Sequence, residues 1–88
     1  MKLKTRIEKV IIACSLARDR KDGSGYLPDI IVFLEEMLKI MNSGGESRKL
    51  RKRRMAGLYR ILSDDVVLLG SVLGKRLVGL MNTYVEKG

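Results

Sequence analysis

The stretch that decides the fold is residues 28–42, PDIIVFLEEMLKIMN. Its apolar residues recur at helical spacing and cover about half of the circumference of a helix. They are Ile30, Ile31, Phe33, Leu34, Met37, Leu38, Ile40 and Met41. Pro28 and Asp29 are typical of a first helical turn, and Gly44 with Gly45 is typical of a helix end. The stretch therefore predicts the most buried helix of the protein.

A narrower apolar stripe lies before this stretch, separated from it by a glycine-rich break at residues 22–25. The stripe follows intervals of four, three, four and three, which places its members on one face of a helix. They are Leu3, Ile7, Val10, Cys14 and Ala17. Ile12 and Leu16 fall on the opposite side, and we expect them to form a protein interface.

The remaining residues, 46–88, are too many for one ordinary helix. Ser63, Asp64 and Asp65 resemble a cap that starts a new helix, so the segment is predicted to divide there. Apolar residues from Val66 to Tyr84 keep helical spacing, and Gly70 and Gly74 would let a neighbouring helix approach closely. The predicted fold is all-α, a small four-helix bundle in which residues 1–88 form one domain.

An alternative fold remains open for the last segment. Residues 66–69 and 77–80 could pair as strands, which would make the protein a winged helix-turn-helix with a C-terminal hairpin. Neither segment alternates polar with apolar residues, however, and no strong two-residue turn lies between them. The helical bundle is therefore the favoured prediction.

The composition excludes most familiar catalytic chemistry. The chain has no His and one Cys, so the usual zinc sites, catalytic triads and intramolecular disulfides are ruled out. Cys14 lies on an apolar stripe with no base to activate it, which predicts a buried structural thiol. We expect a protein that is not an enzyme and that uses no cofactor and no metal.

Positive charge is concentrated in one segment. The net charge is +8, and residues 47–63 hold seven bases and no acid. They are Arg48, Lys49, Arg51, Lys52, Arg53, Arg54 and Arg60. The other eleven bases face ten acids, so the positive field is predicted to belong to this segment alone. Six of the seven bases crowd the start of a helix, where the helix dipole disfavours cations, and an anionic partner would explain that arrangement.

A helical wheel divides this basic segment. Lys49, Lys52, Arg53 and Arg60 share one outward face. The predicted core side holds Leu50, Met55, Leu58, Ile61 and Leu62, with Arg51 and Arg54 at its margins, where their stems could pack. Tyr59 is expected in the core, which leaves this segment without an aromatic side chain to stack on nucleobases. We therefore predict that its seven Lys and Arg side chains bind nucleic-acid phosphates without reading the sequence.

In gross character the chain resembles the small helical accessory subunits of archaeal replicative B-family DNA polymerases, which are short, basic, rich in Leu and Arg and poor in Gln and His. This resemblance implies an accessory subunit in DNA replication that binds a larger protein, such as a DNA polymerase, and contacts the DNA backbone, with RNA as an alternative. Two other hypotheses are a helix-turn-helix DNA-binding regulator and a purely protein-binding or homodimeric module.

The chain carries no apolar run long enough to span a membrane, and the apolar stretch from Val10 to Ala13 is too short for an export signal. We therefore expect a cytoplasmic protein. The absence of Gln and the abundance of Lys, Arg and Glu are typical of thermophilic proteins, although five Met argue against such a source.

Overall fold

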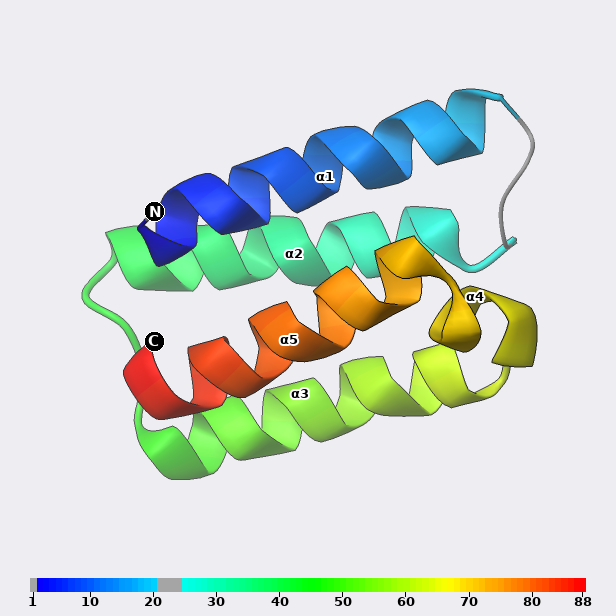
Figure 1. Ribbon diagram of the computed structural model, residues 1–88. Coiled ribbons are helices and arrows are strands. Elements are labelled where there is room, and N and C mark those ends of the chain that lie inside the picture. The colour runs from blue at the N-terminus through cyan, green and yellow to red at the C-terminus, as the bar shows by residue number, and fades with distance from the viewer. Residues whose placement is uncertain (1, 21–24) are drawn as a thin grey trace.

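The computed structural model describes residues 2–20 and 25–88, and these form five α-helices (Figure 1). They are α1 (Leu3–Asp19), α2 (Leu27–Asn42), α3 (Arg48–Ser63), α4 (Val66–Gly70) and α5 (Val72–Lys87). The described residues contain no strand, which confirms the all-α prediction. The winged-helix alternative is wrong, because residues 66–69 lie in α4 and residues 77–80 lie in α5.

The four long helices form a bundle in which α5 lies between α1 and α3. It packs against α1, α3 and α4, while α1 also packs along α2. In Figure 1, α5 lies in front between α1 and α3, and α2 lies behind. α2 and α3 approach each other over a short stretch, and the backbones of α1 and α3 are not neighbours, so α1 and α3 occupy diagonal positions. No helix within the described ranges is both long enough and apolar enough to cross a bilayer.

The core is almost wholly aliphatic. The predicted stripe of α1 is confirmed, because Ile7, Val10 and Cys14 are buried and Leu3 and Ala17 pack beside them. α2 contributes five buried residues, as expected of the most apolar stretch, but α5 contributes as many. Tyr84 is the largest fully buried side chain. The core therefore depends as much on the C-terminal helix as on α2.

Side-chain caps begin α3 and α4, and the cap of α4 lies where the sequence predicted a new helix. The Ser47 hydroxyl accepts a hydrogen bond from the Leu50 amide at 3.3 Å and begins α3. The Asp65 carboxylate accepts one from the Leu68 amide at 3.0 Å and begins α4. Gly44 has a positive φ of 105° just after α2, as its predicted role requires. The break predicted at residues 22–25 lies mainly outside the described residues.

The last predicted helix is broken in two at Ser71. This residue is extended, with φ −77° and ψ 168°, and its hydroxyl accepts a hydrogen bond from the Gly74 amide at 3.0 Å. The same hydroxyl donates to the Leu68 carbonyl at 2.6 Å and so joins the end of α4 to the start of α5. The sequence pattern missed this break because the apolar spacing continues through it. Gly74 does permit a close approach, but from the carbonyl end of α4, whereas Gly70 faces open space.

Two side chains of α3 that were predicted in the core are exposed. Leu50 and Tyr59 each keep 47% of their surface accessible. Of the other predicted core residues of α3, Met55, Leu58 and Leu62 are buried, and Ile61 is partly buried against the core. The physical reason is that α3 leans on α5 and touches α2 sparsely. Its core-facing surface is therefore narrower than the wheel suggests.

The close contact at Gly74 predicts a large effect of a single methyl group. A Cβ there would lie 2.7 Å from the Leu69 carbonyl oxygen and closer still to that of Leu68. Gly74→Ala is expected to lower the free energy of unfolding by about 1–3 kcal/mol, because the backbone must shift. Urea denaturation measures this. Gly70→Ala is the matched control and should be neutral or slightly stabilising; equal losses in both variants would contradict the assignment.

Candidate nucleic-acid interface

The seven bases predicted to bind nucleic acid all lie on α3, but the structure gives them different roles. Three are engaged within the protein: Arg48, Arg51 and Arg54. Four are exposed: Lys49, Lys52, Arg53 and Arg60. The division follows the helical wheel, with the engaged side chains turned toward α5 and the loop before α3.

Arg51 binds backbone carbonyls rather than an external anion. Its Nε and Nη2 donate to the Val85 carbonyl at 3.1 and 3.0 Å, and its Nη1 donates to the Glu46 carbonyl at 2.6 Å. Val85 lies in the last turn of α5, where carbonyl groups lack helical partners and the helix dipole is negative. The guanidinium group therefore caps α5 and ties it to the start of α3.

Arg54 is paired with acids at the same end of the bundle. Its Nε lies 2.8 Å from Glu46 Oε1, and its Nη1 lies 3.2 Å from Glu36 Oε1 on α2. The Tyr84 hydroxyl also donates to Glu46 Oε1, at 3.1 Å. The Glu46 side chain is only 10% exposed, whereas that of Glu36 is 52% exposed, so Glu46 is the carboxylate that is shielded from solvent. Removing Arg54 would leave a shielded carboxylate without its main partner.

Glu46, Arg54, Glu36 and Tyr84 form what we call the Glu46 cluster. Its contacts lower the pKa of Glu46 and raise the pKa of Tyr84. The hydrogen bond from Arg54 lowers the pKa of Glu46, an effect that desolvation opposes and the Tyr84 hydroxyl reinforces. Burial, followed by the negative charge of Glu46, raises the pKa of Tyr84 to about 12. At neutral pH, Glu46 is therefore charged and Tyr84 is a neutral hydrogen-bond donor.

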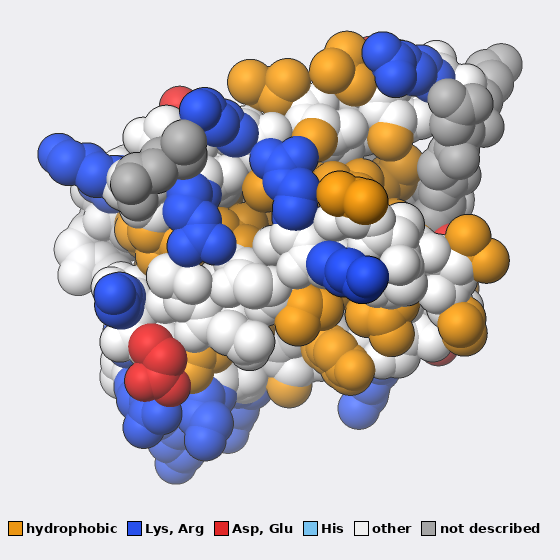
Figure 2. Space-filling model, viewed as in Figure 1, with side chains coloured by type: hydrophobic (Ala, Val, Ile, Leu, Met, Phe, Trp, Pro, Cys, Tyr) orange, Lys and Arg blue, Asp and Glu red, His pale blue; other side chains and the backbone are white. Residues whose placement is uncertain are grey.

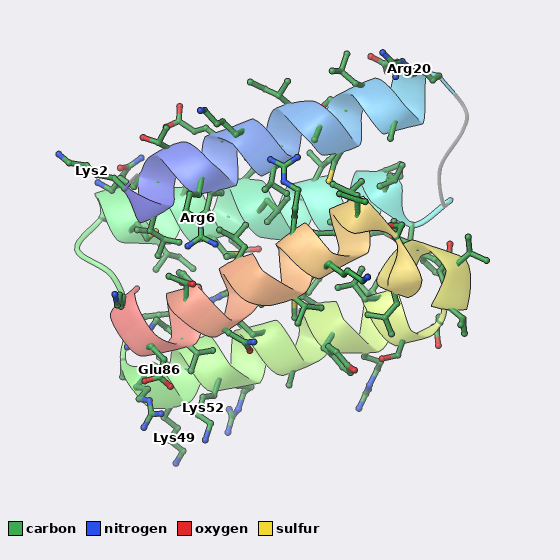
Figure 3. All side chains as sticks on the ribbon, viewed as in Figure 1. Lys2, Arg6, Arg20, Lys49, Lys52 and Glu86 are labelled. Carbon is green, nitrogen blue, oxygen red and sulfur yellow. The ribbon has the colours of Figure 1, made fainter. Side chains whose placement is uncertain are left out.

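The exposed cations form the part of α3 that an external ligand can reach. We call Lys49, Lys52, Arg53 and Arg60 the outer face of α3. No carboxylate in residues 2–20 and 25–88 forms an ion pair with any of them. Lys49 and Lys52 point away from the bundle in Figure 3. Arg48 stands beside this face, but it pairs with Glu86 at 2.8 Å in an exposed contact.

Uncharged groups border the outer face on both sides. Tyr59 lies about two helical turns after Lys52 and directly before Arg60, so it stands at the edge of the outer face, and 47% of its surface is accessible. On the other side, a hollow of about 300 Å³ is lined by Phe33 and Leu50 among apolar groups and by the two arginines Arg53 and Arg54. The sequence analysis placed Tyr59 and Leu50 in the core, so it predicted neither as a ligand contact.

A second cationic surface was missed by the sequence analysis. Arg6 and Lys9 on α1 and Lys75 and Arg76 on α5 line one groove between these helices, which we call the α1/α5 groove. In Figure 2, blue side chains lie along the seam between α1 and α5, apart from the dense group over the start of α3. The prediction that positive charge belongs to one segment is therefore wrong. Counting bases and acids along the chain cannot show which ones the fold separates.

Exposed apolar side chains lie on two other parts of the surface. Ile12 and Leu16, the predicted protein interface, are 59% and 50% exposed on α1. Val66, Val67 and Val72, which the sequence analysis placed on a helix without assigning a contact, are at least 77% exposed around α4. Figure 2 shows hydrophobic side chains at this end of the molecule.

The described residues offer little for covalent or metal chemistry. Cys14 is buried, as predicted, and burial raises the pKa of its thiol to about 11 against the opposing charge of Arg76. Such a thiol is protonated at neutral pH and is a poor nucleophile. Across residues 2–20 and 25–88, no three acidic, His or Cys side chains gather at one place.

Comparisons with family models, with curated proteins and with solved structures give no match to this chain.

The Glu46 cluster makes the free energy of unfolding depend on pH in the acid range, where this stabilising contribution is lost. Because the pKa of Glu46 is lower in the folded than in the unfolded protein, its contribution is complete above its ordinary pKa of 4.5 and is lost as the pH falls below that value. Glu46→Gln is expected to cost about 1–2 kcal/mol of unfolding free energy at pH 7. The gap between variant and parent should shrink below pH 4.5.

Urea denaturation at several pH values measures this gap. Glu86→Gln is the matched control, since Glu86 is exposed and its ion pair with Arg48 is solvated. A gap that stays constant from pH 7 to pH 3 would contradict the role of the Glu46 carboxylate.

Proposed function

We propose that the protein is a non-catalytic accessory protein in a nucleic-acid transaction, and that the outer face of α3 binds the phosphate backbone of DNA or RNA. The observation that carries this proposal is the division of charge on α3. Arg51 and Arg54 have partners inside the fold, whereas Lys49, Lys52 and Arg53 cluster outward without a carboxylate partner among the described residues. Mutual repulsion disfavours such a cluster until an anion binds it.

The chemistry of the outer face favours backbone contacts over base readout. Lys and Arg side chains neutralise phosphates and release counterions, which gives affinity without sequence preference. The Asn and Gln side chains that read adenine are absent from α3. This absence favours an accessory protein over a helix-turn-helix regulator that selects a sequence.

A protein partner completes the proposal. The apolar side chains of Ile12 and Leu16 on α1 lie on a helix that does not contact α3. A larger protein, such as a DNA polymerase, would dock there and leave the outer face of α3 free for nucleic acid. A homodimer through the same side chains is the alternative use of this surface.

The outer face predicts a definite dependence of affinity on salt. If its four cations contact four phosphates, log affinity should fall with log salt concentration at a slope of roughly −3 to −4. Replacing Lys49, Lys52, Arg53 and Arg60 with Ala should flatten this slope and weaken binding to an oligonucleotide, while the melting temperature stays the same. Fluorescence anisotropy over a range of salt concentrations measures both quantities.

The matched control removes the same charge from other surfaces. Lys2, Lys4, Arg20 and Lys39 are exposed and lie outside α3 and outside the α1/α5 groove. A variant with Ala at these four positions should keep the slope of the parent protein. If both variants lose affinity equally, the effect is one of net charge and the outer face is not a site.

Tyr59 predicts a preference for single strands. An exposed aromatic ring beside cations can stack on an unpaired base, a contact worth about 1–3 kcal/mol. Tyr59→Ala should therefore weaken binding to a single-stranded oligonucleotide by roughly tenfold or more and leave duplex binding nearly unchanged. Equal effects on both substrates would show that the ring does not stack on bases.

A second candidate function follows from the hollow beside the outer face. Its apolar lining and the outward-facing Arg53 would suit a peptide that carries an acidic residue and an apolar anchor residue. Leu50→Ser separates the two functions, because it should disrupt peptide binding and leave the salt slope with nucleic acid intact.

A further inference from the structure

The α1/α5 groove is a built feature of the fold that the proposed function does not use. It is an open groove with a volume of about 610 Å³. Val10 and Leu80 supply apolar lining, Gly79 supplies bare backbone, and four cations surround them. In Figure 3 the Arg6 side chain lies between α1 and α5.

The charge of this groove is unbalanced. No acidic residue lines it, and no carboxylate of residues 2–20 and 25–88 pairs with Arg6, Lys9, Lys75 or Arg76. These cations come from two helices far apart in the sequence, so their proximity is a product of the fold. Gathering them costs free energy through repulsion, and a bound anion would reverse that cost.

One of the cations is held in place. Arg6 Nη1 donates to Thr83 Oγ1 at 3.2 Å, and Thr83 Oγ1 donates to the Gly79 carbonyl at 3.0 Å. This chain of hydrogen bonds orients the guanidinium group of Arg6 at the groove while leaving other N–H groups available. A preoriented guanidinium group loses little side-chain entropy when it binds a phosphate.

Gly79 lies in the groove at a position where internal packing does not require glycine. A Cβ at this residue would meet no atom within 4 Å, in contrast to Gly74. Glycine in a helix interior costs roughly 0.5–1 kcal/mol relative to alanine. The bare backbone does, however, let a ligand approach α5 closely between the cations.

The shape of the groove favours an extended anion. Arg6 is hydrogen-bonded to Thr83, which lies seven residues after Arg76 on α5, a separation of about 10 Å along the helix. The cations thus border a channel along both helices instead of converging on one point. A chain of phosphates fits this distribution better than a single small anion does.

We infer that the α1/α5 groove binds a second segment of nucleic-acid backbone, so that one molecule of this protein bridges two segments. The bridging part rests on the proposed function, because it requires the outer face of α3 as the first site. α1 and α3 are diagonal in the bundle, and the side chains of Lys49 and Lys52 point away from α5. The two cationic surfaces therefore face different directions.

The experiment counts short single-stranded oligonucleotides bound to the full chain by native mass spectrometry. A complex of one protein and two oligonucleotides is expected for the parent protein. With donor-labelled and acceptor-labelled oligonucleotides mixed, energy transfer should rise as protein is added. If the parent protein binds only one oligonucleotide, or two only as a protein dimer, bridging by one molecule is overturned.

Two variants assign the sites. Gly79→Leu fills the groove without changing the charge, and it should reduce the count from two to one and abolish energy transfer. Gly70→Leu is the matched control, since Gly70 also faces open space but lies outside the groove, and it should keep the count of two. A count of two for Gly79→Leu, with unchanged energy transfer, would overturn the inference.

The four-residue variant of the outer face separates this inference from the proposed function. It should also reduce the count to one, with the remaining oligonucleotide lost when Gly79→Leu is added. If it loses all binding and Gly79→Leu loses none, the groove inference fails and the proposed function stands. If it loses none and Gly79→Leu abolishes binding, the outer face is not a site and bridging fails.

A small anion is the remaining possibility for the groove. Inorganic triphosphate is the probe, with binding measured by calorimetry on the parent protein and on Gly79→Leu. If Gly79→Leu blocks triphosphate but does not change oligonucleotide binding, the groove takes a small polyphosphate and the inference of a second backbone segment is overturned.

Discussion

The hydrogen bonds of Arg51 with the last turn of α5 are the contact on which the geometry of the basic surface depends. Six cations near the start of a helix oppose the helix dipole, and the fold offsets this by placing the carbonyl end of α5 beside them. Glu46 then neutralises Arg54 at the same end of the bundle. These two internal partners fix how α3 is rotated about its axis, so the remaining cations face solvent as a group.

Much of the fold is predictable from local pattern because each long helix buries one face. The stripe of α1, the apolar face of α2 and the caps at Ser47 and Asp65 are all signals that lie within a few residues of one another. Local pattern fails where packing is uneven. α3 leans toward α5, which leaves Leu50 and Tyr59 exposed, and Ser71 interrupts a spacing that reads as one continuous helix.

The candidate sites were only partly predictable, because two of their features are long-range. The wheel identified Lys49, Lys52, Arg53 and Arg60 as one face, and it set Arg51 and Arg54 apart at the margin. It could not show that one of the two carbonyl acceptors of Arg51 lies 34 residues away, on Val85. The α1/α5 groove could not be predicted for the same reason, since its cations come from opposite ends of the chain. A count along the sequence offsets these cations against acids that do not line the groove.

Arg51 and Arg54 have partners inside the fold, whereas Arg53 and Arg60 face solvent, where we propose that they bind nucleic acid. Side-chain NMR tests this division. Titrating an oligonucleotide into ¹⁵N-labelled protein follows the Nε–H signal of each arginine. The signals of Arg53 and Arg60 are expected to shift, while those of Arg51 and Arg54 stay in place. Equal shifts of all four, or shifts confined to Arg51 and Arg54, would contradict it.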